Sequence, residues 1–204
     1  MDSCFRRNTG YAIDSKIENC HVSGVVECAS SRVGGIAGIA ENSKISDCRT
    51  DADISGCNWS VGGIVGRATI AVTITSSFAD CSITPVSTSK VGGIVGNATV
   101  AITITYCGAN VSVTAAASTV QPFYNAASGV TVTCNDSYSL VNNNGTKINR
   151  ITATSSGMDG KFGMVSSIHD GLPVPLGIYH VSQYGTTTGI ASTLKGSKYG
   201  CTTA

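Results

Sequence analysis

The sequence of 204 residues is poor in charge, in aromatic residues and in proline. Charged residues make up 12% of it, against about 25% in an average soluble domain. Amphipathic helices need charged outer faces, so this deficit argues against a helical protein. The net charge is +1 with no basic cluster, so neither nucleic acid nor an anionic membrane surface is an expected partner. No run of about 18 apolar residues exists, so no membrane insertion is expected.

Two further kinds of signal are missing. Residues 1–7 carry charge but no apolar segment follows them, so we expect no secretory signal peptide in this sequence, which leaves an intracellular location or a shortened chain open. The nine cysteines form no Cys-x-x-Cys pair, so zinc-knuckle and thioredoxin-like sites are not expected. The length allows one domain with a sizeable core, or one domain with a small appendage.

An internal repeat is the main feature that is present. A Val-Gly-Gly-Ile block begins at Val33, Val61 and Val91, with steps of 28 and 30 residues. Residues 14–20 match residues 42–48, again 28 residues apart, and a degenerate unit without the glycines follows at residues 120–126. The repeat therefore runs from about Gly10 to Leu140 and spans most of the chain.

The pattern inside each unit is typical of strands. Val72 and Ile74 alternate with Thr73 and Thr75, which places apolar side chains on one face and hydroxyls on the other. A unit of about 30 residues without a helix cannot bury its apolar face alone, so units must stack. We predict an all-β fold, a parallel β-solenoid of about five layers, and a right-handed β-helix because parallel crossovers favour that hand. The glycine pairs are expected at a bend where a Cβ would obstruct the chain.

The last part of the chain, residues 141–204, loses the period. This part begins with a turn cluster at residues 142–145, and Gly, Thr, Ser and Tyr dominate afterwards. We therefore divide the chain into solenoid repeats at residues 1–140 and a C-terminal cap or irregular β tail at residues 141–204. A cap would cover the strand edges at the end of the coil, and a partly disordered tail is the alternative.

The cysteines are expected to be interior side chains. Cys20, Cys48 and Cys107 fall at one repeat position, with Ser77 there in the third unit and Cys134 near it in the fifth. Because Cys alternates with Val, Ala and Ser at stacked positions, most of the cysteines should be small buried residues that fill a ladder, and disulfides or ligand-binding thiols are the alternative.

The repeated blocks resemble the GLUG motif. The residues that carry the resemblance are Val61-Gly62-Gly63-Ile64-Val65-Gly66 and its two copies, each followed by a strand and a Cys or small residue. Asp170-Gly171-Leu172-Pro173-Val174 is similar to the segment that closes such proteins, although Pro175-Leu176 departs from the usual aromatic ending. The resemblance implies a bacterial cell-surface or secreted protein of adhesin-like type, further domains in a longer chain, and an extracellular glycan or a host or matrix protein as partner.

Candidate catalytic and metal sites are few. Asp51 and Asp53 share a strand face, so a weak calcium or acid-pair site is one interpretation and a solvated surface is the other. His21, His169 and His180 have no Ser/His/Asp arrangement around them. His169, Asp170, His180 and Cys201 lack ligand-like spacing, so no metal is expected there. The prediction is a non-catalytic protein without a cofactor.

One aromatic residue stands out as a candidate ligand contact. Trp59, next to Asn58, would stack on a sugar ring or a partner if it is exposed, or it would pack at a corner of the coil. Tyr179, Tyr184 and Tyr199 form a second candidate patch in the tail. The sequence favours an adhesion or glycan- or protein-binding module, with a carbohydrate-active β-helix enzyme and a purely structural stalk as alternatives.

Overall fold

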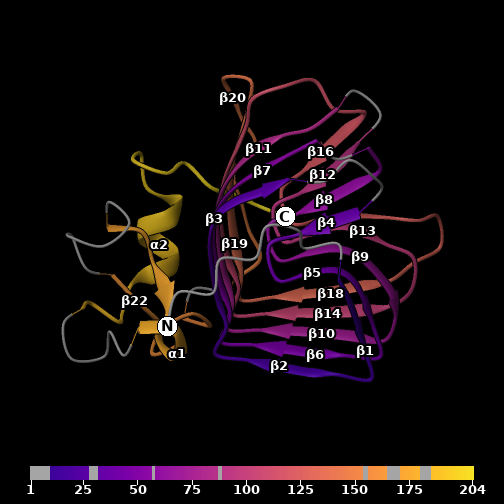
Figure 1. Cartoon of the computed structure of the whole chain (residues 1–204). Coiled ribbons are helices and arrows are strands. Elements are labelled where there is room, and N and C mark those ends of the chain that lie inside the picture. Colours follow the sequence, from indigo (N-terminus) through magenta and orange to yellow (C-terminus); the bar gives the residue numbers. More distant parts are fainter. Residues whose placement is uncertain are drawn as a thin grey trace.

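The computed structural model describes residues 10–27, 32–56, 58–86, 89–153, 156–164, 171–179 and 185–204. In these residues the chain winds as a coil of short parallel strands, which stack into four sheets (Figure 1). Each turn contributes one strand to a sheet, so paired residues lie one repeat apart, as for Tyr11 with Ile39 and Val72 with Ile102. The predicted all-β parallel solenoid is confirmed.

The four sheets are named in the order in which the chain enters them. Sheet A contains β1 (Tyr11–Ile13), β5 (Ala37–Glu41), β9 (Val65–Ile70), β13 (Val95–Ala98) and β17 (Tyr124–Ala126). Sheet B contains β2 (Lys16–Glu18), β6 (Lys44–Ser46), β10 (Val72–Thr75), β14 (Ile102–Thr105) and β18 (Val132–Asn135). Sheet C contains β3 (His21–Glu27), β7 (Arg49–Ser55), β11 (Phe78–Thr84), β15 (Gly108–Val113) and β19 (Tyr138–Asn143). Sheet D contains β4 (Arg32–Gly34), β8 (Ser60–Gly62), β12 (Lys90–Gly92) and β16 (Thr119–Gln121).

The number of turns is slightly smaller than the predicted number of layers. Sheet D has four strands, so the described chain completes about four turns, and β17, β18 and β19 make an incomplete fifth. The degenerate unit still forms a sheet D strand, because Val120 of β16 pairs in register with Val91. After β19 the chain turns back into two short strands that pair antiparallel with β19, and no described strand follows in sheet D. The count of units therefore exceeds the count of complete turns.

The core of the coil consists of stacked apolar side chains that point inward. Ile45, Ile74 and Ile104 lie in register on sheet B and are fully buried. Thr73 and Thr75, which alternate with them, point outward and are half-buried. Burying one such isoleucine contributes about 1.5–3 kcal/mol, and the ladder repeats this gain in each turn.

The glycine pairs lie where sheet D bends sharply into sheet A. A Cβ on Gly62 would lie 2.0 Å from the carbonyl oxygen of Val65, and one on Gly63 would lie 2.3 Å from that of Gly93. Both obstructing groups are backbone, which cannot rotate away. The predicted bend is confirmed, and its requirement for glycine comes from close approach of the backbone.

The corner between sheets B and C contains the cysteine column. The residue before it has a positive φ, as in Asp47 with φ 54° and Ser76 with φ 48°. The Sγ of Cys48 then donates to the carbonyl oxygen of Ser46 at 3.1 Å, and the Oγ of Ser77 donates to that of Thr75 at 2.9 Å. Ser77 Oγ also accepts from the backbone N–H of Cys48 at 3.3 Å. Cysteine and serine thus perform the same local task in successive turns.

The interior position of the cysteines is confirmed for three residues and differs for others. Cys48, Cys81 and Cys107 are buried free thiols, whereas Cys20 is exposed in the first turn. Cys134 lies near the column, as expected, but not in it: it pairs in register with Ile104 on sheet B, and Ser137 occupies the corner position. Cys4, Cys28 and Cys57 lie outside the described residues.

We predict that thiol reactivity follows this burial. Burial raises the pKa of Cys48 and of Cys107 to about 12, so their thiolate fraction at pH 8 is about a thousandfold below that of an ordinary thiol. Iodoacetamide should therefore modify Cys20 in the native protein and the two interior cysteines only after denaturation. Site-resolved mass spectrometry measures the three rates, and equal rates for Cys20 and Cys48 would contradict this packing.

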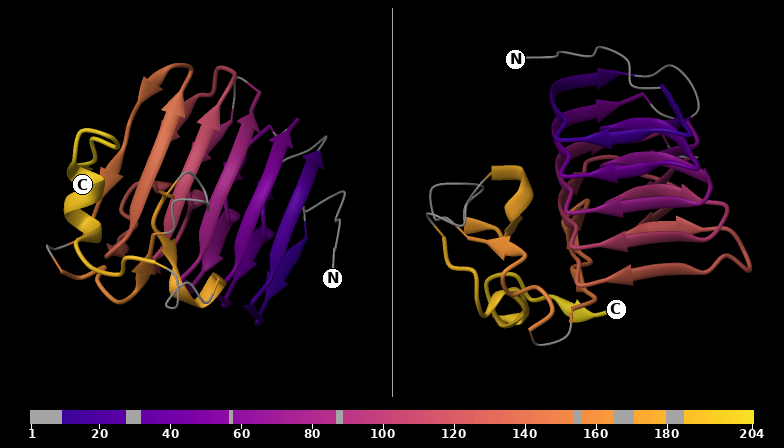
Figure 2. Two further views of the ribbon diagram at one scale, coloured as in Figure 1. Left: turned by 90° about the vertical axis from the view of Figure 1, so that its left-hand side faces the viewer. Right: turned by 90° about the horizontal axis from the view of Figure 1, so that it is seen from below.

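The tail continues one sheet and then folds beside the coil. β20 (Thr146–Lys147) and β21 (Arg150–Ile151) pair antiparallel with β19, and β24 (Thr202–Thr203) pairs with β21. β22 (Phe162–Gly163) pairs with β23 (Val174–Pro175), followed by α1 (Leu176–Tyr179) and α2 (Ile190–Lys195). Figure 2 shows this tail, in orange and yellow, against the outer side of sheet C. It extends one sheet, whereas sheets A, B and D end at β17, β18 and β16.

A second hydrophobic core joins the tail to sheet C. Tyr138 is fully buried, packs against Phe162 with ring centroids 5.9 Å apart, and donates to the carbonyl oxygen of Pro173. Leu172 and Val174, from the predicted closing segment, are buried in the same core, while Asp170 lies outside the described residues. In the part of the chain that the structure describes, no helix has the length and apolar character needed to cross a membrane.

Candidate functional site

The first candidate site is a groove at the corner between sheets D and A, with a volume of about 450 Å³. It is called the Trp59 groove, and its lining residues are Arg32, Asn58, Trp59, Ser60, Arg67, Lys90 and Asn97. These residues come from three successive turns. The groove is therefore a product of stacking, because no single repeat unit contains it.

The repeat brings the lining residues together by register. Arg32, Ser60 and Lys90 each precede a Val-Gly block and pair with one another through β4, β8 and β12. Arg67 and Asn97 follow the bend and pair through β9 and β13. Stacked strands lie about 4.8 Å apart, so side chains at one repeat position form a closely spaced column. Two columns on either side of the glycine bend thus form the walls.

Trp59 lies at the corner of the coil and remains exposed. Its exposed fraction is 63%, so the corner does not bury it. The guanidinium carbon of Arg32 lies 5.4 Å from the centroid of the indole ring, which is a cation–π arrangement. This contact orients the ring while leaving much of its surface available. Of the two expectations for Trp59, the exposed position is the one observed.

Two polar atoms under the groove have unused hydrogen-bonding capacity. The Nε of Arg67 and the Oδ1 of Asn97 are buried, and no group in the described chain bonds either of them. Leaving such an atom unsatisfied costs roughly 1–3 kcal/mol. Most buried polar atoms of native proteins have a partner, and exceptions concentrate where a ligand, an ion or water completes the network.

The charge of the groove has one sign. Arg32, Arg67 and Lys90 are its charged lining residues, and no described lining residue is acidic. The neighbouring segments 28–31 and 87–88, outside the described residues, contain no Asp or Glu in their sequences. The groove therefore concentrates three cations in a chain whose net charge is +1.

A second groove of about 740 Å³ lies on the outer face of sheet C. Asp51, Asp53 and Asp80 line it, so the carboxylates of two adjacent strands lie along one wall. Asp51 and Asp53 share a strand face, as expected. In the next turn Asp80 occupies the position of Asp51 and accepts from Asn110 Nδ2 at 3.0 Å.

Basic side chains hold Asp51, a feature that the sequence did not suggest. Asp51 Oδ2 forms an ion pair with Arg49, two residues earlier on the same face, and lies 2.8 Å from His21 Nε2 in the previous turn. His21 is thus part of an acid–base contact on the surface, since it is about half exposed. Among the described residues, no group of three or more His, Cys, Asp or Glu is arranged to hold a metal ion.

The tail candidates are only partly described. His169, Asp170, His180 and Tyr184 lie outside the described residues. Cys201 is buried, with its pKa raised by burial to about 11. Tyr199 donates to the carbonyl oxygen of Gly171 at 3.2 Å, which gives it a structural contact.

The basic residues of the Trp59 groove were missed at the sequence level, although a signal exists. Arg32 and Lys90 both stand immediately before a Val-Gly-Gly block, and Arg67 stands immediately after Gly66, the last residue of the six-residue repeat that begins at Val61. In a solenoid these offsets place the side chains side by side. Aligning the flanks of the blocks as well as the blocks themselves would have revealed the cluster.

The comparisons with known proteins identify one motif. Residues 29–55 match the family model of the GLUG motif. This segment includes β4, β5, β6 and β7, which together form one full turn of the coil. Comparison with curated proteins gave no match, and neither did comparison with solved structures.

Proposed function

We propose that this GLUG-motif repeat protein is a non-catalytic interaction module of a bacterial cell-surface or secreted protein, and that it binds an extracellular glycan through the Trp59 groove. The observation that carries the proposal is the exposed, oriented ring of Trp59 on the wall of a groove in a rigid coil. Aromatic rings expose an apolar face that stacks on the C–H face of a sugar ring. The coil itself is a structural repeat module, and the GLUG resemblance supports the surface location.

The architecture supports recognition by many modest contacts. Solenoids present extended surfaces whose side chains repeat with the turns. On sheet B the outward residues Thr73, Thr75, Thr103 and Thr105 form two hydroxyl columns beside the groove-bearing sheets. A polymer that runs along the coil would meet the same pair of hydroxyls in these two turns, so weak contacts would add up.

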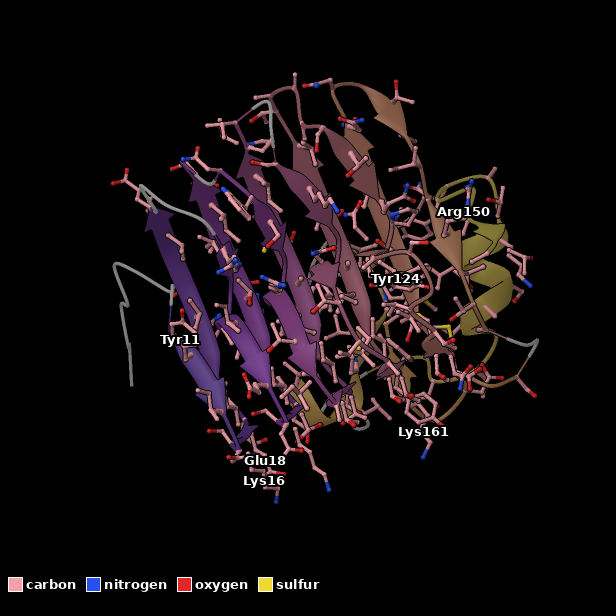
Figure 3. The ribbon with its side chains drawn as sticks, turned by 90° about the vertical axis from the view of Figure 1, so that its right-hand side faces the viewer. Tyr11, Lys16, Glu18, Tyr124, Arg150 and Lys161 are labelled. Carbon is pink, nitrogen blue, oxygen red and sulfur yellow. The ribbon has the colours of Figure 1, made fainter. Side chains whose placement is uncertain are left out.

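Replacing Trp59 by alanine is expected to weaken glycan binding about 30-fold, because truncating a central aromatic residue typically costs about 2 kcal/mol or more. A glycan array followed by titration of the best ligand measures this. Tyr11→Ala is the control: Tyr11 is an equally exposed aromatic, 67% accessible, at the first turn (Figure 3). It lies two turns before Arg67 in the same column of sheet A and does not line the groove. Equal losses in both variants, or no glycan bound by the wild type, would contradict the proposal.

A second candidate function, cleavage of a polysaccharide, is favoured by one observation. Glycosidases use two carboxylates that flank the scissile bond, and Asp51, Asp53 and Asp80 line one groove. The ion pair of Asp51 with Arg49 and its contact with His21 favour instead a fixed, charge-compensated carboxylate. Cleavage of any polysaccharide by the purified protein, abolished by Asp51→Asn or Asp53→Asn, would replace the binding proposal. A purely structural stalk would bind nothing on the array.

A further inference from the structure

We infer that the Trp59 groove binds an anionic saccharide, whose carboxylate or sulfate groups pair with the cations of Arg32, Arg67 and Lys90. The inference rests on the proposed function and names its ligand class. Three observations lead to it: the uncompensated cations, the position of Arg67, and the spacing of the basic column.

The cations of the groove have no acidic partners in the described chain. The ion pairs in this part of the chain join Lys16 with Glu18, and His21 and Arg49 with Asp51. Lys16 and Glu18 lie together at the edge of sheet B, at the first-turn end of the coil (Figure 3). Arg32 forms a cation–π contact with the indole ring of Trp59. Because the indole is neutral, this contact does not neutralise the positive charge of Arg32.

The position of Arg67 is the strongest of the three observations. Its side chain is only half-exposed, and its Nε is buried without an acceptor. A cation that has lost part of its hydration and has no counter-ion is destabilising. An anion bound at the mouth of the groove would compensate this charge. Guanidinium groups bind carboxylate and sulfate-like oxyanions with two parallel hydrogen bonds, which adds directional preference.

The spacing of the basic column suits a repeating anionic chain. Arg32 and Lys90 occupy the same repeat position two turns apart, with Ser60 between them. Two steps of strand spacing separate them by about 9.6 Å, which is the length scale of a disaccharide. Asn58 and Asn97 add amide groups of the kind that bond sugar hydroxyls.

The rest of the surface favours this location for an anion. The groove on sheet C carries Asp51, Asp53 and Asp80, which would repel a polyanion. The exposed ring of Trp59 favours a saccharide over an acidic peptide, because it offers a flat apolar face beside the charges. Charge and shape therefore point to the same corner of the coil.

The test uses the full chain and a matched pair of probes, tetragalacturonate and the same tetrasaccharide with its carboxyl groups reduced to alcohols. Titration calorimetry should show the acid form binding at least tenfold more tightly. Its affinity should fall as salt rises from about 50 to about 200 mM, because charge pairing is screened. A chondroitin tetrasaccharide with and without its sulfate groups distinguishes sulfate from carboxylate as the preferred anion, because both forms contain the same carboxylates. Tighter binding of the sulfated form assigns sulfate and equal binding assigns carboxylate, and binding of either form more tightly than the carboxyl-reduced probe supports the inference.

Variants locate the site. Arg67→Met and Lys90→Met should each weaken binding of the acid form at least tenfold, while Lys147→Met, an equal change of charge at an exposed residue of β20, should leave it unchanged. A thermal melt of each variant shows whether it folds. If Arg67→Met does not fold, Lys90→Met alone tests the inference. Equal loss in Lys147→Met would overturn the inference.

The two proposals fail differently. If the reduced tetrasaccharide binds as well as the acid, and Trp59→Ala abolishes both, the anionic ligand is wrong and the glycan-binding function stands. If polyglutamate binds the groove as tightly as the acid sugar, the saccharide class is overturned. If no acidic or neutral glycan binds at all, the proposed function fails, and the inference fails with it.

Discussion

Replacing Gly62 by alanine is expected to lower the melting temperature of the coil by about 6–12 °C, which corresponds to a loss of about 3 kcal/mol. The added Cβ would lie 2.0 Å from the carbonyl oxygen of Val65 and 2.7 Å from that of Ile94. The Ile94 oxygen accepts hydrogen bonds from Ile64 and Val65, both at 3.0 Å. Relieving the overlap must therefore move backbone that ties two turns together. Circular dichroism during heating measures the effect.

Gly129→Ala is the control for this prediction. Gly129 has a φ of 78°, and a Cβ there would meet nothing within 4 Å. Its replacement should therefore cost only the strain of a left-handed residue, roughly 1–2 kcal/mol. If Gly62→Ala were no more destabilising than Gly129→Ala, the tight bend between β8 and β9 would be wrong, and with it the geometry of the Trp59 groove.

The coil was predictable from the sequence because each repeat position is a structural position. The spacing of Val33, Val61 and Val91 equals the register of β4, β8 and β12. The alternation around Ile74 likewise equals the inward and outward pattern of β10. In a parallel stack the period alone determines which residues meet, so sheet pairing needs no long-range inference.

Prediction was incomplete at the corners of the coil and in the tail. In the fifth unit the period continues unchanged: Ser137 lies 30 residues after Cys107 and occupies the corner position, whereas Cys134 pairs with Ile104. At the corners of the coil, Asp, Asn, Ser and even Tyr106 have a left-handed backbone conformation with positive φ. Of these residue types, only Asp and Asn favour that conformation, so the others could not be predicted from residue type. The tail has no repeat at all, so its packing against sheet C depends on tertiary contacts that no local pattern records.

The candidate site was predictable in part for the same reason. Trp59 and the shared face of Asp51 and Asp53 follow from residue type and strand alternation. The contact of His21 with Asp51 joins two turns 30 residues apart, and the convergence of Arg32, Arg67 and Lys90 joins three. To predict these contacts, both the register between stacked turns and the geometry of the bend must be known. The sequence of a single unit contains neither.

Replacing Tyr138 by alanine is expected to detach the tail from the coil while most of the coil stays folded. Tyr138 is fully buried beneath the tail, and Gly108 leaves room for its ring beside that of Phe78, since a Cβ on Gly108 would lie 2.8 Å from each. Truncating such an aromatic costs about 3–5 kcal/mol. Solenoid turns are stabilised mainly by their nearest neighbours, so hydrogen exchange should accelerate after residue 156 and remain slow in β7 and β11.

Tyr138→Phe separates the ring from its hydroxyl in the same experiment. Burial raises the pKa of Tyr138 well above its ordinary value, so the hydroxyl stays protonated and donates to the carbonyl oxygen of Pro173. The phenylalanine variant keeps the contact with Phe162 and loses one buried hydrogen bond, which is worth about 1 kcal/mol. It should therefore accelerate exchange in the tail only slightly. If Tyr138→Ala accelerated hydrogen exchange equally in the tail and in the central strands of sheet C, the prediction would be wrong. The two cores would then unfold as one unit.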